Sequence, residues 1–372
     1  MSAHDLRMVA DCFRLRGDFV SAEPYGTGHI NDSYAVVVDQ AGRSLRYLFQ
    51  RINHNVFHDP PKVMSNIERV TEYVRQKLRD QGLPDVSRRT LTIIPSTEGR
   101  SYQEIDGDYW RVYIFIERAR AHDSLEVPEQ AFEAAKAFGN FQKMLSDLPG
   151  DPLHETIPDF HSGPKRLKDF QQALEADGWN RAAIGRDEIE FLQKNAWVFD
   201  VLPEQVSKGN IPMRTTHNDT KVNNVLFDDE SGEGICVIDL DTLMPGLVLY
   251  DFGDMVRTST SKAAEDEQDL RKVFLDFRMF EQVARGYLTA AGDFLNESEK
   301  QHLVFAGKMI TLIIGCRFLT DYLSGDTYFK THREGQNLDR CRTQFQMVKS
   351  IMEQEEEMIS LVERIRSDLE FS

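Results

Sequence analysis

The sequence predicts an α+β protein with two lobes, a small antiparallel sheet followed by a larger, mostly helical lobe that contains one β-hairpin. Before about residue 117, runs of β-branched and aromatic residues predominate. Beyond it, apolar residues recur at helical spacing, and the segment 211–241 returns to short strand-like runs. The chain has 372 residues, which exceeds one compact domain of ordinary size. We therefore expect lobes at 1–117 and 118–372.

The first lobe is predicted from strand-like runs around a single helix. The runs S-Y-A-V-V-V and L-R-Y-L-F-Q-R-I are joined by a turn that contains glycine, which is typical of a hairpin. Further along, Val63, Ile67, Val70 and Val74 fall on one stripe and predict a helix. The expected elements are strands at 33–38, 45–52, 91–94 and 109–116 and a helix at 62–78.

The second lobe is predicted to combine helices with an embedded hairpin. The apolar runs V-L-F and I-C-V-I flank a turn that contains Ser-Gly. If these runs pair, Val225 faces Ile238, and Asn224 lies beside Asp239 at the open end. The expected helices are at 128–145, 165–176 and 187–199, and over most of the chain from Asp266 onward.

Composition excludes some classes of partner. The formal net charge of −17 argues against nucleic acid or an anionic membrane as main partner, because both are bound through basic surface. The four cysteines are scattered, so neither a disulfide framework nor a zinc site is indicated. The N-terminus lacks the apolar core of a signal peptide, and the most apolar helical stretch, 309–316, is far shorter than the roughly 20 residues that span a bilayer. We expect a soluble, cytoplasmic protein, and its oligomeric state stays open.

One segment, T-H-N-D-T-K-V-N-N-V-L followed by V-I-D-L-D, carries most of the chemistry. His217, Asp219 and Asn224 match H-x-D-x-x-x-x-N, the catalytic-loop spacing of kinase-like phosphotransferases. In the predicted hairpin, Asn224 and Asp239 bring two oxygen ligands together, which suits a hard cation such as Mg²⁺.

A nearby D-F-G, which begins at Asp251, resembles the magnesium-binding motif of protein kinases but lies in another place. Asp251 follows Asp239 by twelve residues, beyond a P-G turn, and so cannot share the register of the hairpin. We expect Asp251 to cap a helix that begins near Gly253 and to brace the catalytic loop.

The motif H-N-D-x-x-x-x-N with I-D-x-D resembles the aminoglycoside phosphotransferase and choline kinase superfamily, which implies the two-lobed protein-kinase-like fold. More narrowly, E-P-Y-G-T-G-H-I-N, V-I-D-L-D-T-L-M-P-G, D-F-G-D and C-R-F-L-T-D-Y-L-S-G-D-T-Y-F are similar to the N-acetylhexosamine 1-kinases. The similar blocks run from about residue 23 to residue 329. This resemblance implies phosphorylation of the anomeric hydroxyl of N-acetylglucosamine or N-acetylgalactosamine with ATP and Mg²⁺.

The resemblance also implies roles for the motif residues. Asp219 would be the catalytic base, because the attacking hydroxyl needs an acceptor for its proton, and Asn224 and Asp239 would bind Mg²⁺. Lys221 could reach the γ-phosphate, although a surface lysine is an equally good interpretation, and His217 would organise the loop.

The nucleotide side is predicted from position in the chain. Y-G-T-G-H-I-N precedes the strand at Ser33, where a loop that covers phosphates belongs, and its glycines let backbone amides approach phosphate oxygens. The usual position of the phosphate-binding lysine holds glutamine, which could hydrogen-bond the following helix but supplies no charge; Lys221 or Arg51 could compensate. Adenine is expected at the crossover 116–118. The expected ATP-binding residues are Gly26, Gly28, Asn31, Gln50, Glu68 and Glu117.

The acceptor sugar is expected to bind in the helical lobe. Arg317 and Asp321 are four residues apart on one helical face, where an ordinary salt bridge is the simplest interpretation. The resemblance instead favours sugar recognition by Arg317, Asp321 and Tyr328. Two alternatives stay open: an aminoglycoside or other small-molecule hydroxyl kinase, and a nucleotide-binding module without catalysis, which the missing lysine suggests.

Overall fold

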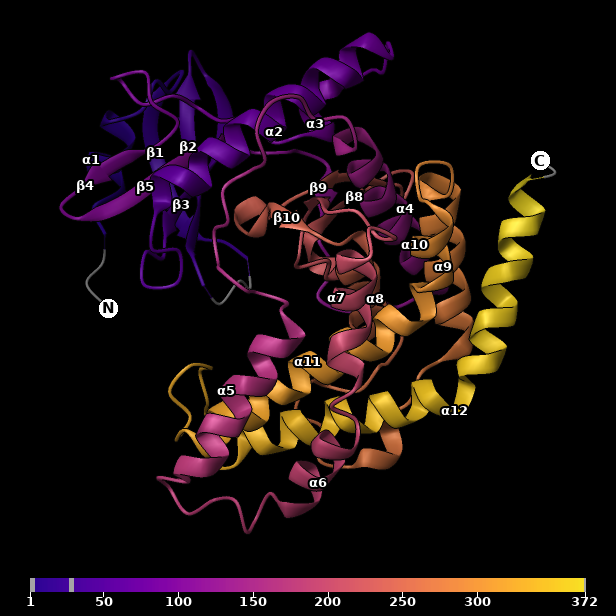
Figure 1. The fold of residues 1–372 in the computed structure, drawn as a ribbon. Coiled ribbons are helices and arrows are strands. Elements are labelled where there is room, and N and C mark those ends of the chain that lie inside the picture. Colours follow the sequence, from indigo (N-terminus) through magenta and orange to yellow (C-terminus); the bar gives the residue numbers. More distant parts are fainter. Residues whose placement is uncertain (1–3, 27–29, 371–372) are drawn as a thin grey trace. The chain divides into compact units, whose positions relative to one another are not determined.

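The computed structural model describes residues 4–26 and 30–370 of the chain, which form two compact units (Figure 1). Unit 1 comprises residues 1–123, 147–158 and 225–245, and unit 2 comprises the rest. The chain first leaves unit 1 near the expected boundary at 117–118. However, two later segments return to unit 1, and one of them carries the embedded hairpin.

The core of unit 1 is a five-stranded antiparallel sheet in the order β1-β2-β3-β5-β4. Alternating apolar residues give it one buried face, to which Val36, Val38, Phe49 and Val112 contribute fully buried side chains. The strands are β1 Asp18–Pro24, β2 Asp32–Gln40, β3 Arg43–Ile52, β4 Gln103–Ile105 and β5 Asp108–Ile114; the helices are α1 Leu6–Asp11, α2 Pro60–Asp80 and α3 Val86–Arg89.

Helix α2 shows how local sequence sets an element. The Asp59 side chain accepts a hydrogen bond from the Lys62 backbone N–H, and proline occupies the first turn, where its missing N–H costs nothing. The predicted stripe of valine and isoleucine is buried along its length, so the predicted helix is confirmed and extends two residues at each end.

The embedded hairpin belongs to a three-stranded sheet in the order β6-β8-β9, made of β6 Ala119–Arg120, β8 Val225–Asp228 and β9 Gly234–Val237. Val225 pairs with Val237, so the predicted pairing with Ile238 is wrong by one residue. The ladder is irregular between Leu226 and Phe227, and such a bulge shifts the register in a way that counting from the turn misses.

Unit 2 is built around α11, Leu303–Leu323, which packs against α5, α8 and α12 (Figure 1). Among the described residues, α11 is the helix long and apolar enough to span a membrane, yet 83% of its most apolar window is buried inside the structure, as in a core helix. The other helices of unit 2 are α4 Pro128–Leu145, α5 Gly163–Ala176, α6 Arg186–Lys194, α7 Val198–Ser207, α8 Val248–Ser259, α9 Phe277–Ala291, α10 Glu297–Gln301 and α12 Gln336–Glu370.

Several short elements connect these helices and strands. They are β7 Arg214–Thr216, β10 Met244–Gly246, η1 Val222–Asn224, η2 Leu240–Thr242 and η3 Leu270–Lys272.

Two predicted elements differ from the structure. The segment 91–94 forms only an isolated bridge between Ile93 and Tyr113, and the proline that follows it cannot donate to a ladder. The predicted helix 187–199 is two helices, because α6 ends at Lys194 and the Asn195 side chain donates to the Phe191 carbonyl at 2.8 Å. That bond satisfies a carbonyl at the end of α6.

Candidate active site

The loop that follows β7 is held by a carboxylate from α8. Backbone N–H groups of His217 and Asn218 donate to the two oxygens of Asp251 at 2.9 and 2.6 Å, and the Thr220 hydroxyl donates to its backbone carbonyl at 2.6 Å. The predicted bracing of the loop is therefore confirmed. The predicted capping role is wrong, because α8 already begins at Val248.

Asp251 itself is fully buried and has further support. The Gln142 amide donates to its Oδ2 at 2.6 Å, and Tyr287 donates to the Gln142 carbonyl oxygen at 2.6 Å. Burial raises the pKa of the Asp251 carboxyl, although His217 and the hydrogen bonds act in the opposite direction. Both oxygens of the D-F-G aspartate thus accept from donors that fix the loop.

Asp219 lies at the exposed side of this loop, with a quarter of its side chain open to solvent. Lys221 Nζ is 3.0 Å from Asp219 Oδ1, and the Asn224 amide donates to Oδ2 at 3.2 Å and to the Asp219 carbonyl at 2.8 Å. Burial alone would raise the pKa of the Asp219 carboxyl, but Lys221, His217 and Arg257 outweigh it and hold that pKa below its usual range. The carboxylate is therefore ionised at neutral pH and able to accept a proton.

His217 organises the loop from its interior. Its side chain is fully buried, and its ring lies edge-on to Phe138 with 5.4 Å between the ring centres. Its Nδ1 accepts a hydrogen bond from the Asp219 backbone N–H at 3.3 Å. The contacts of this histidine thus fix the backbone that carries Asp219.

Asn224 and Asp239, the expected magnesium ligands, both carry side-chain oxygen atoms of the kind that Mg²⁺ prefers. The Asn224 amide nitrogen donates to Asp219, which leaves the amide oxygen as a possible ligand. Asp239 follows β9 in the left-handed region at φ 57°, and because Val225 pairs with Val237, the residues before β8 and after β9 leave the hairpin at the same end. The described residues contain no cluster of three histidine, cysteine or acidic side chains that could hold a metal. Mg²⁺ does not need one, since it is usually bound by one or two side chains together with phosphates and water.

Gln50 occupies the strand position expected of a lysine, but its partners differ from the prediction. The amide nitrogen donates to the Ser33 hydroxyl at 2.9 Å, and the amide oxygen accepts from Arg111 Nε at 3.1 Å. The predicted hydrogen bond to Glu68 is therefore wrong, and Glu68 is exposed on α2. Arg51 contacts Asp32 and Asp108 instead of standing free as a substitute cation.

A buried arginine that the sequence analysis missed stands directly opposite Gln50. Arg111 of β5 pairs with Gln50 in the sheet register, and its guanidinium binds both oxygens of Asp241. Both side chains are 1% exposed, and Asn31 also donates to Asp241 Oδ2 at 2.5 Å. Burial disfavours the Arg111 cation, but Asp241 and Asp239 keep its pKa above the ordinary value. An arginine within the apolar run W-R-V-Y was the signal that could have found it.

Of the remaining residues predicted to bind ATP, the structure describes Gly26 and Glu117. Gly26 has φ 82°, which favours glycine, whereas Gly28 lies outside the described residues. The predicted crossover residue Glu117 accepts from Arg46 Nε at 2.9 Å, and the Arg46 guanidinium lies 3.9 Å from the ring centre of Phe115. The Glu117 side chain, shortly after the end of β5, thus contacts an arginine of β3.

In unit 2, Arg317 and Tyr328 lie together. Arg317 Nη2 donates to the Tyr328 hydroxyl at 3.3 Å, and its guanidinium lies 5.1 Å from the ring centre of Phe160 and 5.4 Å from that of Phe329. Burial, together with neighbouring arginines, lowers the pKa of Arg317. The Arg317 guanidinium is therefore a hydrogen-bond donor with aromatic rings around it.

Asp321 does not form the simple salt bridge with Arg317. Its Oδ1 accepts from the backbone N–H groups of Thr327 and Tyr328 at 2.9 and 2.8 Å, and its Oδ2 accepts from that of Phe329 at 2.9 Å. Asn337 completes the set by donating to Oδ2 at 2.8 Å. The contacts of Asp321 therefore fix the loop that presents Tyr328.

Solved structures with the same fold include several kinases. An aminopropanol kinase associated with a microcompartment has a TM-score of 0.61 and 15% identity, covering 95% of this chain and 97% of that one. Spectinomycin phosphotransferase, in complex with ADP and spectinomycin, has a TM-score of 0.58 and 13% identity over 94% and 97%. A choline/ethanolamine kinase family protein from Mesorhizobium loti has a TM-score of 0.51 and 14% identity over 92% and 92%.

The sheet of unit 1, the helices of unit 2 and the braced loop with Asp219 agree with this kinase-like fold. The pattern of one phosphotransferase family matches residues 21–290, well over half of the chain. The protein therefore belongs to the phosphotransferase enzyme family abbreviated APH.

Proposed function

We propose that this chain is an ATP- and Mg²⁺-dependent kinase that phosphorylates the anomeric hydroxyl of N-acetylglucosamine or N-acetylgalactosamine. Family membership supports phosphotransfer, and similar folds that were crystallised with ADP and AMP support a nucleotide as co-substrate. The similarity of several motifs to N-acetylhexosamine 1-kinases supports the acceptor.

The observation that carries the proposal is the ionised Asp219 on its braced loop. In the proposed reaction, Asp219 accepts the proton of the attacking sugar hydroxyl, while Lys221 holds the Asp219 carboxylate and offers positive charge toward phosphate. Asn224 and Asp239 would hold Mg²⁺, which when bound neutralises charge on the phosphates.

On the nucleotide side, Gly26, Gly28, Asn31, Gln50 and Glu117 stay our proposed ATP-binding residues; Glu68, expected as a partner of Gln50, is not retained, because Ser33 and Arg111 take that place. Arg111 supplies the positive charge that Gln50 lacks, but its guanidinium is bound to Asp241 and Gln50. We infer that Arg111 contributes indirectly. It fixes the strands and the segment that carries Asp239, and the charge of Asp239 raises the pKa of Arg111.

The polar groups around Arg317 suit the hydroxyls and acetamide of an N-acetylhexosamine, which need both donors and acceptors. Arg166 and Arg257 act on the pKa of Arg317, but Arg257 is paired with Asp254 and Arg166 lies 3.6 Å from Asp169. The motif similarity therefore supports the sugar more than local charge does. We propose that Arg317 and Tyr328 bind the sugar and that Asp321 positions Tyr328.

A substrate panel tests the proposal. We expect phosphorylation of N-acetylglucosamine and N-acetylgalactosamine with ATP and Mg²⁺, with the phosphate on the anomeric oxygen by ³¹P and ¹H NMR. Turnover of aminoglycosides or amino alcohols without turnover of either sugar would overturn the acceptor assignment. ATP binding without turnover of any acceptor would support the non-catalytic alternative.

A further inference from the structure

Helix α8 carries a second buried aspartate one turn beyond Asp251. Asp254 lies three residues later and so on the same helical face as the residue that braces the catalytic loop. Its side chain is 4% exposed. Arg257 Nε donates to Asp254 Oδ1 at 2.8 Å, and Arg257 Nη2 lies 2.7 Å from the same oxygen.

The other oxygen of Asp254 is buried without a donor. Among the described residues, none donates to Asp254 Oδ2, although its exposed area is close to zero. Leaving a buried carboxylate oxygen unpaired is costly, and such an atom in a native structure calls for an explanation. The arginine that could cover both oxygens places both of its contacts on Oδ1.

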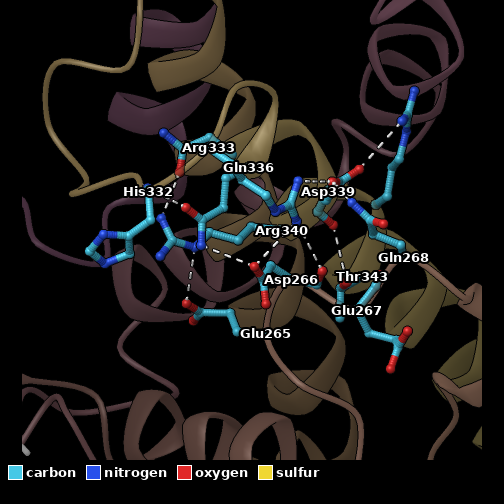
Figure 2. A network of polar contacts seen from close by, with 12 residues as sticks. Glu265, Asp266, Glu267, Gln268, His332, Arg333, Gln336, Asp339, Arg340 and Thr343 are labelled. Carbon is cyan, nitrogen blue, oxygen red and sulfur yellow. Dashed lines mark hydrogen bonds and ion pairs between the residues drawn. The ribbon is translucent and has the colours of Figure 1, made fainter.

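The position of Arg257 is set from a second side. Arg257 Nη1 lies 3.8 Å from Glu265, and Glu265 also lies 3.5 Å from Arg340 Nε. Figure 2 shows Glu265 and Arg340 within a polar network that joins the segment after α8 to the start of α12 through Asp266 and Asp339. Arg257 is thus anchored, and it holds the Asp254 carboxylate in one orientation.

Asp254 belongs to the surroundings of the catalytic loop. Its charge acts on Lys221, the partner of Asp219, and on His161. His161 Nε2 lies 2.8 Å from the Asn218 carbonyl, which can only accept, so Nε2 carries the hydrogen. Burial lowers the pKa of His161 to about 4, and the neutral ring therefore has Nδ1 as an acceptor, which is buried and has no donor among the described residues.

We propose that Asp254, positioned by Arg257, is an acceptor-binding residue whose free Oδ2 receives a hydrogen bond from a hydroxyl of the sugar. The inference rests on the proposed function and deepens it, because two buried acceptors near Asp219 call for a substrate with several O–H donors. Glu299 has both oxygens paired, with Arg214 and the Asn296 backbone, whereas Glu188 resembles Asp254 in having Arg342 on one oxygen and no donor among the described residues on the other. The place of Asp254 beside the catalytic loop, together with its free oxygen, therefore carries the proposal.

The test is Asp254→Asn, with Glu299→Gln as the matched control. Loss of the charged acceptor should raise the KM for the sugar roughly 10–100-fold and leave the KM for ATP within about twofold. The control removes an equally buried charge and should lower the melting temperature without changing the KM for the sugar. An unchanged sugar KM in folded Asp254→Asn would overturn the proposal.

Deoxy sugars identify the contact independently of stability. In the wild type, the analogue that lacks the contacted hydroxyl should have a raised KM, and Asp254→Asn should abolish that difference. If Asp254→Asn does not fold, Arg257→Lys, which removes one of the two donors that orient the carboxylate, should give a smaller rise in the same KM. Equal deoxy-sugar losses in variant and wild type would contradict the contact.

The proposed function fails differently, since the wild type would then reject both N-acetylhexosamines. The comparison of Asp254→Asn with the control is in that case made with the acceptor that the panel shows to be phosphorylated. A rise in the KM for that acceptor supports the role of Asp254, and an unchanged KM overturns it.

Discussion

Two buried arginine–aspartate pairs, one in each unit, differ in what they leave unsatisfied. In unit 1, Arg111 and Asp241 are both 1% exposed, and every polar atom of the pair has a protein partner: Arg111 Nε reaches Gln50, and Asn31 adds a donor to Asp241. In unit 2, Arg257 places two donors on one oxygen of Asp254, and the second oxygen has none among the described residues.

We interpret the difference as that between a scaffold and the proposed binding site. A buried ion pair with all of its hydrogen bonds made holds strands in one arrangement, and removing one partner leaves an uncompensated charge. A buried carboxylate with a free oxygen gives up stability that a hydroxyl donor from a substrate would restore. Neither burial nor incomplete pairing reveals a function by itself, since Glu188 with Arg342 is also incompletely paired; the position of Asp254 beside the catalytic loop is what distinguishes it.

The largest loss of stability is expected where the pair is complete. Arg111→Met leaves Asp241 buried without its cation and should cost about 3–5 kcal/mol in the free energy of unfolding. Arg51→Met, on the neighbouring strand, removes an arginine that is 25% exposed and should cost about 1 kcal/mol or less. Urea unfolding of both variants measures the difference. Equal losses would show that the Arg111 pair is no scaffold.

Asp219→Asn tests a carboxylate that we propose to act in catalysis, so the variant should lose turnover and keep its stability. The variant keeps the shape of the side chain but cannot accept the proton of the sugar, so kcat should fall about 10²–10⁴-fold while unfolding by urea changes little. Isothermal titration should find ATP binding nearly unchanged. A variant with most of the wild-type kcat would remove Asp219 from the role of base.

Asp239 and Asp251 should also differ in role, one in metal binding and the other in stability. Asp239→Asn should weaken the apparent affinity for Mg²⁺ by at least the roughly 10–100-fold that loss of an outer-shell partner costs a metal site. Asp251→Asn, whose oxygens hold the loop, should lower the free energy of unfolding by about 1–3 kcal/mol. Kinetics at varied Mg²⁺ and thermal melts distinguish them. If only Asp251→Asn changes the metal dependence, both assignments are wrong.

The predictable part of the site is the part that is local in the chain. His217, Asp219 and Asn224 lie in one short loop, so their spacing alone placed them together. Asp254 and Arg257 were not found, because an i, i+3 acid–base pair on a helix is ordinary in sequence, and its free oxygen depends on the packing of other helices.

The fold shows the same limit. The helix periodicity and the β2–β3 hairpin were predictable from patterns that the structure retains. The one-residue shift of β8 against β9 and the partners of Gln50 depend on a bulge and on the pairing of β3 with β5, which residues distant in the chain decide.

The last expected effects concern the edge of the proposed acceptor site, and the smallest of them is that of Tyr328→Phe. Among the described residues, Arg317 has one side-chain hydrogen bond, at 3.3 Å to Tyr328, and the Tyr328 residue is 62% exposed. Arg317→Ala should raise the KM for the sugar much more than that for ATP, since loss of a hydrogen bond to a charged group costs about 1.5–3 kcal/mol, or roughly one to two decades in affinity.

Tyr328→Phe removes only a neutral hydroxyl and should cost about 0.5–1.5 kcal/mol in the free energy of sugar binding. Asp321→Ala, which releases the loop of Tyr328, should raise the same KM with a lower melting temperature. Steady-state kinetics with each substrate varied, on variants checked by thermal melts, measure all three. An unchanged sugar KM in Arg317→Ala would make Arg317 a structural residue and confine sugar recognition to the surroundings of Asp254.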